Sequence, residues 1–166
     1  MAGAAMTVSD EVIRAYEDMK VREGATPEEA QQRKKAVLFR VNKDNSQVIV
    51  DEGKVILVGT AGDDPYQRFI DLLPDGECRF AVYCASVTTA DVGDKEGNVF
   101  ITWTPKNAPI KSQLLYSTIK HVVRRELVEI KAEMEATSRE ELEDRHKLAK
   151  KLESLSTIIK LEGKNL

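Results

Sequence analysis

The sequence lacks the signatures of most enzymes, metal sites and membrane proteins. It contains no P-loop, no glycine-rich dinucleotide motif, no HExxH or GxSxG motif and no EF-hand loop. No apolar run approaches the ~20 residues that a membrane-spanning helix needs. The first residues have neither the charged segment nor the long apolar segment of a signal peptide. These absences predict a cytoplasmic protein that is not an enzyme and that needs no metal ion or cofactor.

Cysteine and histidine are scarce, with two of each. Cys78 and Cys84 fall on one predicted strand, where their even spacing puts both on the same face but about 20 Å apart. A disulfide requires Cα atoms within about 7 Å, so we expect two reduced thiols, which suits an intracellular protein. His121 and His146 are predicted on different helices, where exposed positions explain them better than metal ligation.

What the sequence does have is the composition of one globular domain. Hydrophobic residues make up 42% of the chain and charged residues 32%. With the hydrophobic pattern of this sequence, such a composition excludes a disordered chain and a coiled coil. A sequence pI of 5.6 and only 5% aromatic residues argue against nucleic-acid binding. The length of 166 residues suits a single domain, which we expect over residues 8–166 after a flexible N-terminal segment over residues 1–7.

Hydrophobic periodicity and turn signals predict helices and strands in alternation. The predicted helices cover residues 10–20, 26–35, 63–73, 109–127 and 139–154. The predicted strands cover residues 36–41, 47–50, 79–89, 99–103, 128–134 and 157–161, and residues 55–58 either continue the second strand or end it. We expect residues 91–98 to form the charged tip of a hairpin. This order predicts an α/β fold of the α+β type, with a mixed central sheet flanked by helices on both faces.

Helix starts are marked by capping residues. Ser9, Thr26 and either Asp63 or Asp64 precede predicted helices as N-caps, and a capping box from Ser138 to Glu141 opens the last helix.

The helix predicted over residues 109–127 has two different faces. Its apolar face carries Leu115, Tyr116, Ile119, Val122, Val123 and Leu127. Its other face carries Lys111, Gln113, Leu114, Ser117, Lys120, His121, Arg124 and Arg125. There are five Lys/Arg and no Asp/Glu from Lys106 to Arg125, although the chain has a formal net charge of −3. A solvated face is the usual explanation of such charges.

Two details favour a binding surface on this helix instead. Acidic residues are missing at the i+4 positions along the basic face. Leu114 places a large apolar side chain among the cations, where the core does not need it. Together they predict contact with an acidic partner.

Seven segments run in order along nearly the whole chain: VSDEVIRAYEDMKVR, TPEEAQQRKKAVLFRV, DEGKVILVG, DDPYQRFIDLLP, ECRFAVY, APIKSQLLYSTIK and LEGK. In sequence and spacing they resemble the actin-depolymerising factor/cofilin family. The resemblance implies one actin-depolymerising-factor homology domain. It also implies a monomeric, cytoskeleton-associated protein that binds monomeric and filamentous actin, and that severs and depolymerises filaments.

The resemblance also implies two binding surfaces. The first surface binds monomers and filaments through the N-terminal segment and the long helix, and its matching positions are Ala4, Ala5, Met6, Ser9, Lys111, Gln113, Leu114, Lys120, Arg124 and Arg125. The second surface binds only filaments, through the hairpin tip and the last helix, and its matching positions are Lys95, Glu96, Glu140, Glu141, Asp144 and Arg145. Leu114 is expected to be the apolar anchor of the first surface, ringed by cations that face an acidic partner.

The chain departs from the family in several places. Residues 2–5 carry no hydroxyl group, so the inhibitory phosphorylation of many animal members is not expected there. Residues 31–35 have lost two cations of the basic run that acts as a nuclear import signal in vertebrate relatives. Gln113 and Glu126 replace residues that are often Lys, and Ala132 replaces a histidine that could sense pH.

Three alternatives remain at the level of sequence. The basic face of the long helix could hold phosphoinositide head groups at a membrane surface. It could contact nucleic acid, which the acidic pI disfavours. The protein could also bind actin monomers without severing filaments, if the second surface is lost.

Overall fold

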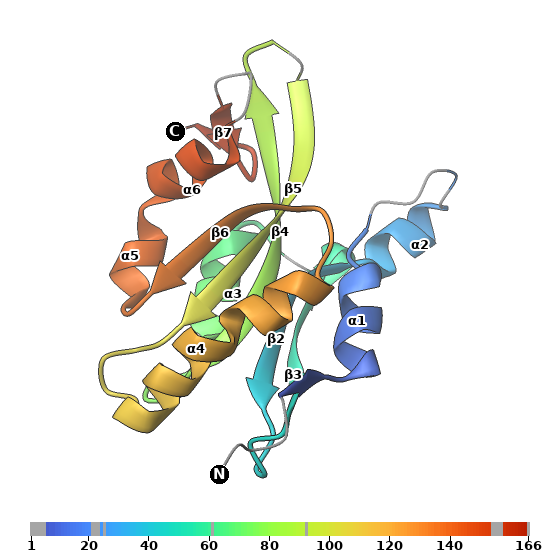
Figure 1. Ribbon diagram of the computed structural model, residues 1–166. Helices are drawn as coiled ribbons and strands as arrows, with labels where there is room; N and C mark the ends of the chain where they lie inside the picture. The colour runs from blue at the N-terminus through green and yellow to red at the C-terminus, as the bar shows by residue number, and fades with distance from the viewer. Residues whose placement is uncertain are drawn as a thin grey trace.

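The fold is built on one long antiparallel ladder. The computed structural model describes residues 6–20, 24, 26–60, 62–91, 93–153 and 158–165. Strand β4 (Arg79–Thr89) pairs along its whole length with β5 (Gly93–Trp103). Around this pair the strand order is β1-β3-β2-β4-β5-β6, with β7 added to β4 and β8 added to β7. Figure 1 shows the β4–β5 hairpin projecting beyond the rest of the sheet, with β7 and α6 beside it.

The remaining strands extend the sheet on both sides of this ladder. They are β1 (Thr7–Val8), β2 (Lys34–Val41), β3 (Gln47–Leu57), β6 (Ile130–Ala136), β7 (Ile158–Leu161) and β8 (Lys164–Asn165). The pairs β1–β3 and β5–β6 are parallel, and the other pairs are antiparallel. This is the mixed sheet that the sequence predicts.

Helices cover both faces of the sheet (Figure 1). They are α1 (Asp10–Glu17), α2 (Pro27–Gln32), α3 (Pro65–Leu72), α4 (Ile110–Glu126), α5 (Arg139–Glu143) and α6 (Arg145–Leu152), with a single 3₁₀ turn at Val58–Thr60. Three predicted N-caps are confirmed. The side chains of Ser9, Thr26 and Asp64 accept hydrogen bonds from backbone amides in the first turns of α1, α2 and α3.

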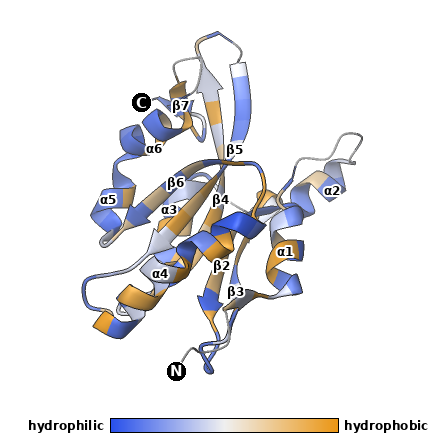
Figure 2. Cartoon of the chain, viewed as in Figure 1, coloured by the Kyte–Doolittle hydropathy of each residue, from blue (hydrophilic) through white to orange (hydrophobic). Residues whose placement is uncertain are grey.

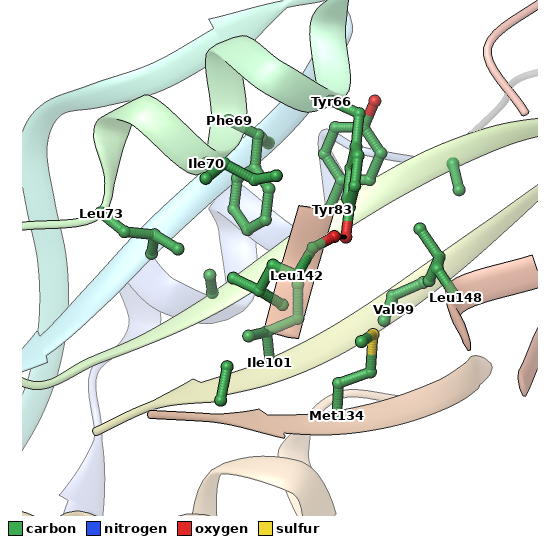
Figure 3. Packing of buried hydrophobic residues seen from close by; sticks show 14 of the residues in the cluster. Tyr66, Phe69, Ile70, Leu73, Tyr83, Val99, Ile101, Met134, Leu142 and Leu148 are labelled. Carbon is green, nitrogen blue, oxygen red and sulfur yellow. Dashed lines mark hydrogen bonds between the residues drawn. The ribbon is translucent and has the colours of Figure 1, made fainter. Parts of the chain in front are cut away.

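The sheet separates two hydrophobic cores. On one face α3, α5 and α6 pack on the sheet, and Figure 3 shows Tyr66, Phe69, Leu142 and Leu148 meeting around Tyr83. On the other face α1 and α4 cover a second core. Its members include Val12, Tyr16, Met19, Phe39, Phe80, Phe100, Tyr116, Ile119, Val123 and Leu127. Each side of the sheet therefore carries its own set of helices on a rigid base.

The two cysteine thiols are free and buried, in agreement with the sequence prediction. Burial raises the pKa of Cys78 to about 11 and also raises the pKa of Cys84. Both groups are therefore protonated thiols at neutral pH, a form that is a poor nucleophile.

The hairpin tip is shorter than predicted. Residues 93–98 belong to β5 and continue the ladder with β4, so the prediction of a loop over residues 91–98 was wrong. Their charged and glycine-containing sequence shows no apolar alternation, but pairing with β4 satisfies their backbone groups. Lys95 and Glu96 consequently lie within a strand. Likewise, β3 is one strand of 11 residues, so residues 55–58 mostly continue it.

The last predicted helix is broken in two at Asp144. The carboxylate of Asp144 accepts a hydrogen bond from the amide of His146 and so caps the start of α6. Because Asp144 is the N-cap of α6, α5 ends after one turn. The predicted capping box was also wrong, because Ser138 makes no side-chain cap. Glu141 instead accepts hydrogen bonds from the amide and the hydroxyl of Thr137, at 2.9 and 3.0 Å.

Other boundaries moved by a few residues. α1 and α2 end earlier than predicted, and Lys34 already pairs within β2. The strand after α4 begins at Ile130, because Glu129 adopts a left-handed backbone with φ 64°. Val128 was predicted within this strand but precedes it, and its side chain is 55% exposed. The two-residue strands β1 and β8 are too short to give a periodic signal.

Candidate functional site

Helix α4 presents an exposed apolar pair. Tyr116, Ile119 and Val123 are buried in the core as predicted, and Leu115 and Val122 are half-buried. On the outer side Leu114 is 64% exposed and Ile110 is 74% exposed. Figure 2 shows that α4 is apolar toward its N-terminal end and hydrophilic at its C-terminal end. Ile110 was missed at the sequence level, although its i, i+4 spacing from Leu114 is the signal for a shared face.

We call this outer face the α4 surface; it comprises Ile110, Lys111, Leu114, Lys120, Arg124 and Arg125. Two tyrosines hold α4 in place beneath it. The hydroxyl of Tyr116 accepts from the amide of Val41 at 2.8 Å. The hydroxyl of Tyr16 donates to the carbonyl of Val128, directly after the helix. Burial raises the pKa of both phenols, so the two hydroxyls stay protonated. Their contacts hold the middle of α4 and the chain just after its C-terminal end.

Two cations of the α4 surface have partners on the neighbouring strand. Lys120 forms an ion pair with Glu135, and Nε of Arg124 lies 3.6 Å from a carboxylate oxygen of Glu133. The sequence analysis considered only acids on the same helix and therefore missed these two partners on β6. All four groups are partly exposed, and such surface pairs contribute about 0–1 kcal/mol each. Lys120 and Arg124 can therefore exchange these acids for a partner's carboxylates at little cost in free energy.

The other two cations of the α4 surface are open. Lys111 and Arg125 are exposed, and neither has a carboxylate partner among the residues that the structure describes. The α4 surface thus combines an apolar pair with cations that are free or only weakly held. This arrangement suits a partner that has an apolar cleft with an acidic rim.

The other residues predicted for the first surface have mixed positions. Gln113 donates from Nε2 to the carbonyl of Ala108 at 2.8 Å, so its side chain braces the start of α4. Ser9 is buried and caps α1. Met6 is half-buried against the same core as α4, so this residue lies on the α4 side of the sheet. Ala4 and Ala5 lie outside the described residues.

The second surface consists of Lys95, Glu96, Glu140, Glu141, Asp144 and Arg145. Most of these side chains are engaged within the protein. Nη2 of Arg33 donates to both carboxylate oxygens of Glu96, at 2.9 Å each. Arg145 makes a similar contact with Asp64, at 2.8 Å twice, and stacks over the ring of Tyr66. Lys95 and Glu140 are exposed and have no side-chain partner within the described part of the chain.

The Arg145–Asp64 contact fixes α6 to the start of α3. Partial burial by itself raises the pKa of Asp64, but the hydrogen bonds from Arg145 and from the amide of Gln67 outweigh it. The pKa of Asp64 therefore lies below its ordinary value. The carboxylate is ionised near neutral pH, and the contact keeps its full charge there.

A cavity lies next to the second surface. Its volume is about 310 Å³, and its lining includes Lys95, Lys131, Lys151 and Leu152. The lysines come from three different elements, β5, β6 and α6. Lys131 and Lys151 were missed at the sequence level, because no local pattern connects residues so far apart in the chain.

The shortened basic run of residues 31–35 extends into β2, and its cations form ion pairs within the protein. Arg33 contacts Glu96, Lys34 contacts Asp18 at 2.7 Å and Lys35 contacts Glu162 at 2.8 Å. All three cations that remain in this run therefore have a carboxylate partner.

The sequence model of cofilin/tropomyosin-type actin-binding proteins matches residues 5–153. The chain belongs to this family. Membership implies actin as the partner, association with the cytoskeleton, and a role without catalysis. It also confirms the resemblance on which the two predicted surfaces rest.

Solved structures of cofilin-like proteins share the fold. The cofilin of Streptomyces griseoflavus is 26% identical with a TM-score of 0.67, and the match covers 89% of this chain and 97% of that one. Actin depolymerization factor 2 of Plasmodium berghei is 22% identical with a TM-score of 0.68, covering 88% and 96%. Coactosin of Entamoeba histolytica is 19% identical with a TM-score of 0.66, covering 92% and 96%. These matches confirm the predicted fold class.

Within the described residues, no group of three or more His, Cys, Asp or Glu side chains is arranged to hold a metal ion. Within the same residues, no helix has the length and apolarity to cross a bilayer.

Proposed function

We propose that the protein binds monomeric and filamentous actin as a monomer in the cytoplasm, and that it severs and depolymerises filaments. The observation that carries this proposal is the exposed pair Ile110 and Leu114. They are the two most exposed large apolar side chains among the described residues, and they lie one turn apart on α4. Solvent exposure of two neighbouring apolar side chains is unfavourable unless a partner covers them.

The cations of the α4 surface support the same partner. Lys111, Lys120, Arg124 and Arg125 surround the apolar pair on the same helix. Actin binding in the family implies an apolar cleft with an acidic rim as the complement. The apolar pair would supply most of the affinity, and the cations would speed association and set orientation.

Severing requires contact with two actin subunits at once. The α4 surface would bind one subunit in the way that it binds a monomer. The second surface would bind the neighbouring subunit through exposed groups such as Lys95 and Glu140. Because the two surfaces lie on one rigid sheet, binding both subunits would tilt one against the other and weaken the filament.

The direct test is imaging of labelled actin filaments with the purified protein. We expect breaks along the filaments and faster loss of subunits from their ends. Breaks should become rare with Leu114→Ala, whereas Ile159→Ala removes an exposed apolar side chain away from α4 and should keep monomer binding intact. Decoration of filaments without breaks would contradict severing, and absence of any binding would contradict the proposed function.

Phosphoinositide binding is a second candidate for the same surface. Lys111 and Arg125 are exposed cations without a carboxylate partner among the described residues, and anionic head groups attract such cations. Lipid and actin would then compete for the α4 surface. Vesicles with and without a phosphoinositide, sedimented with the protein, test this candidate. Equal binding to both kinds of vesicle would exclude specific recognition.

A further inference from the structure

Strand β4 has one edge that is divided between two strands. β5 pairs with all 11 residues of β4 on its other edge. The divided edge pairs with β2 over Phe80–Tyr83 and with β7 over Val87–Thr89. β2 and β7 thus lie end to end, and residues 84–86 of β4 face the junction between them.

A buried ion pair fills this junction. Nζ of Lys35, at the start of β2, lies 2.8 Å from Oε1 of Glu162, which follows β7, and the two side chains are only 5% and 4% exposed. Ser86 completes the contact from β4. Its hydroxyl accepts from Lys35 at 3.0 Å, and its amide donates to Glu162 at 2.7 Å. The Lys35 ammonium also lies 5.3 Å from the centre of the Tyr83 ring.

The ion pair holds an element that is weak by itself. β7 has four residues and β8 has two, and a two-stranded hairpin of this size is not stable alone. Glu162 begins the turn between them with a left-handed backbone, φ 53°, followed by Gly163 with φ 78°. The amide of Glu162 donates to the carbonyl of Ser86 at 2.7 Å. The backbone and the carboxylate of one residue therefore attach the β7–β8 hairpin to β4.

The position of this hairpin matters for the second surface and not for the α4 surface. β7 packs against α6 and pairs with the projecting half of β4, which together with β5 carries Lys95. Helix α4 packs on the other face of the sheet and contacts β1, β4 and β5. A shift of the β7–β8 hairpin would therefore displace α6 and the β4–β5 tip before it affects α4.

We propose that Lys35 and Glu162 are positioning residues for the second surface. This inference rests on the proposed function, because it assigns the pair to filament binding as distinct from monomer binding. Loss of one member leaves the other as an uncompensated buried charge, which is strongly unfavourable. The hairpin then has to move outward so that water can reach the remaining charge.

The test compares two adjacent lysines. Lys35→Gln and Glu162→Gln each remove the buried pair with little change in shape. Lys34→Gln is the matched control, because Lys34 pairs with Asp18 at the surface, where the two side chains are 26% and 47% exposed. Actin-monomer affinity and filament co-sedimentation are measured for all three variants, at a temperature where each is folded by circular dichroism.

We expect Lys35→Gln and Glu162→Gln to weaken filament binding at least tenfold while monomer affinity stays within twofold, and Lys34→Gln to change neither. Amide hydrogen exchange should become faster in residues 158–165 and stay unchanged in α4. Unchanged filament binding, or parallel loss of both affinities in a folded variant, would overturn the inference. So would failure of both buried-pair variants to fold, since the pair would then serve overall stability. Absence of filament binding by the unaltered protein would instead overturn the proposed function.

Discussion

The two surfaces use charge in different ways. On the α4 surface Lys111 and Arg125 are exposed, and Lys120 and Arg124 form only partly exposed pairs with Glu135 and Glu133. On the second surface Arg145 and Glu96 each take part in an arginine–carboxylate contact that involves both carboxylate oxygens. These contacts connect α6 to the start of α3 and the β4–β5 hairpin to the start of β2. The α4 surface thus offers charge to a partner, whereas much of the charge on the second surface maintains its shape.

This difference shows that a charged residue at a family position can serve the fold. Arg145 and Asp144 match the predicted filament contacts, but one holds Asp64 and the other caps α6. Recognition by the second surface would depend on the placement of the few exposed groups, such as Lys95. Recognition by the α4 surface would depend on the exposed groups themselves.

We expect the largest effect from a variant of the α4 surface. Arg124→Ala combined with Arg125→Ala removes two of its four cations, and we expect actin-monomer affinity to fall about a hundredfold, roughly 3 kcal/mol. The fold should survive, because Arg125 is exposed and the pair of Arg124 with Glu133 is weak. Fluorescence titration of labelled monomers measures the affinity. Unchanged affinity in a folded variant would remove these arginines from the interface.

A smaller effect should come from the structural charge of the second surface. Arg145→Ala removes the ion pair with Asp64 and the contact with the Tyr66 ring. We expect a loss of about 2 kcal/mol in the free energy of unfolding, or roughly 4–8 °C in Tm for a chain of this size. Arg125→Ala, which removes an exposed arginine, is the matched control and should leave Tm unchanged. Equal Tm values for the two variants would contradict a structural role for Arg145.

The same contact should give a pH dependence. The folded-state pKa of Asp64 is lowered. Asp64 therefore stabilises the folded protein fully above its unfolded-state pKa, and this stabilisation disappears as the pH falls through the folded-state pKa. The difference in unfolding free energy between the unaltered protein and Arg145→Ala should therefore be constant near neutral pH and shrink in acid. Denaturant titrations at a series of pH values measure it. A difference that grows in acid would contradict the assignment.

We expect the smallest effect from removing the acids that pair with the α4 surface. Glu133→Gln combined with Glu135→Gln removes the acids that pair with Arg124 and Lys120. We expect a two- to threefold gain in monomer affinity, about 0.5 kcal/mol, because the cations become more available. The gain should shrink at high ionic strength. The control is Glu28→Gln with Glu52→Gln, which changes the net charge equally at exposed positions elsewhere; the same gain in that control would indicate a long-range effect of net charge.

Local periodicity predicted those elements in which one face is buried. The apolar stripe of α4 was correct because burial of one helix face imposes a period of 3.6 along the chain. β4 was predicted instead from its nearly continuous apolar run, because both of its faces are buried. The extension of β5 over residues 93–98 was not predictable in this way, since its pairing with β4 and not its own sequence makes it a strand. The break at Asp144 was missed because an aspartate can either continue a helix or cap the next one.

Contacts between residues far apart in the chain also limit how much of the candidate site the sequence can predict. Leu114 and the cations of the α4 surface follow from one helix, so a helical projection of the sequence finds them. Glu133 and Glu135 come from the next strand, and their pairing with α4 follows only from the packing of the fold. Lys35 and Glu162 are 127 positions apart, and the LEGK segment by itself does not identify the lysine that its glutamate contacts.

Parallel affinity measurements on two variants decide whether the two surfaces are separable. Monomer affinity and filament co-sedimentation are determined for Leu114→Ala on the α4 surface and for Lys95→Ala on the second surface. We expect Leu114→Ala to weaken both monomer and filament binding by about 2 kcal/mol, and Lys95→Ala to weaken filament binding alone. If Lys95→Ala lowered monomer affinity as well, or if Leu114→Ala left it unchanged, the division into two surfaces would be wrong.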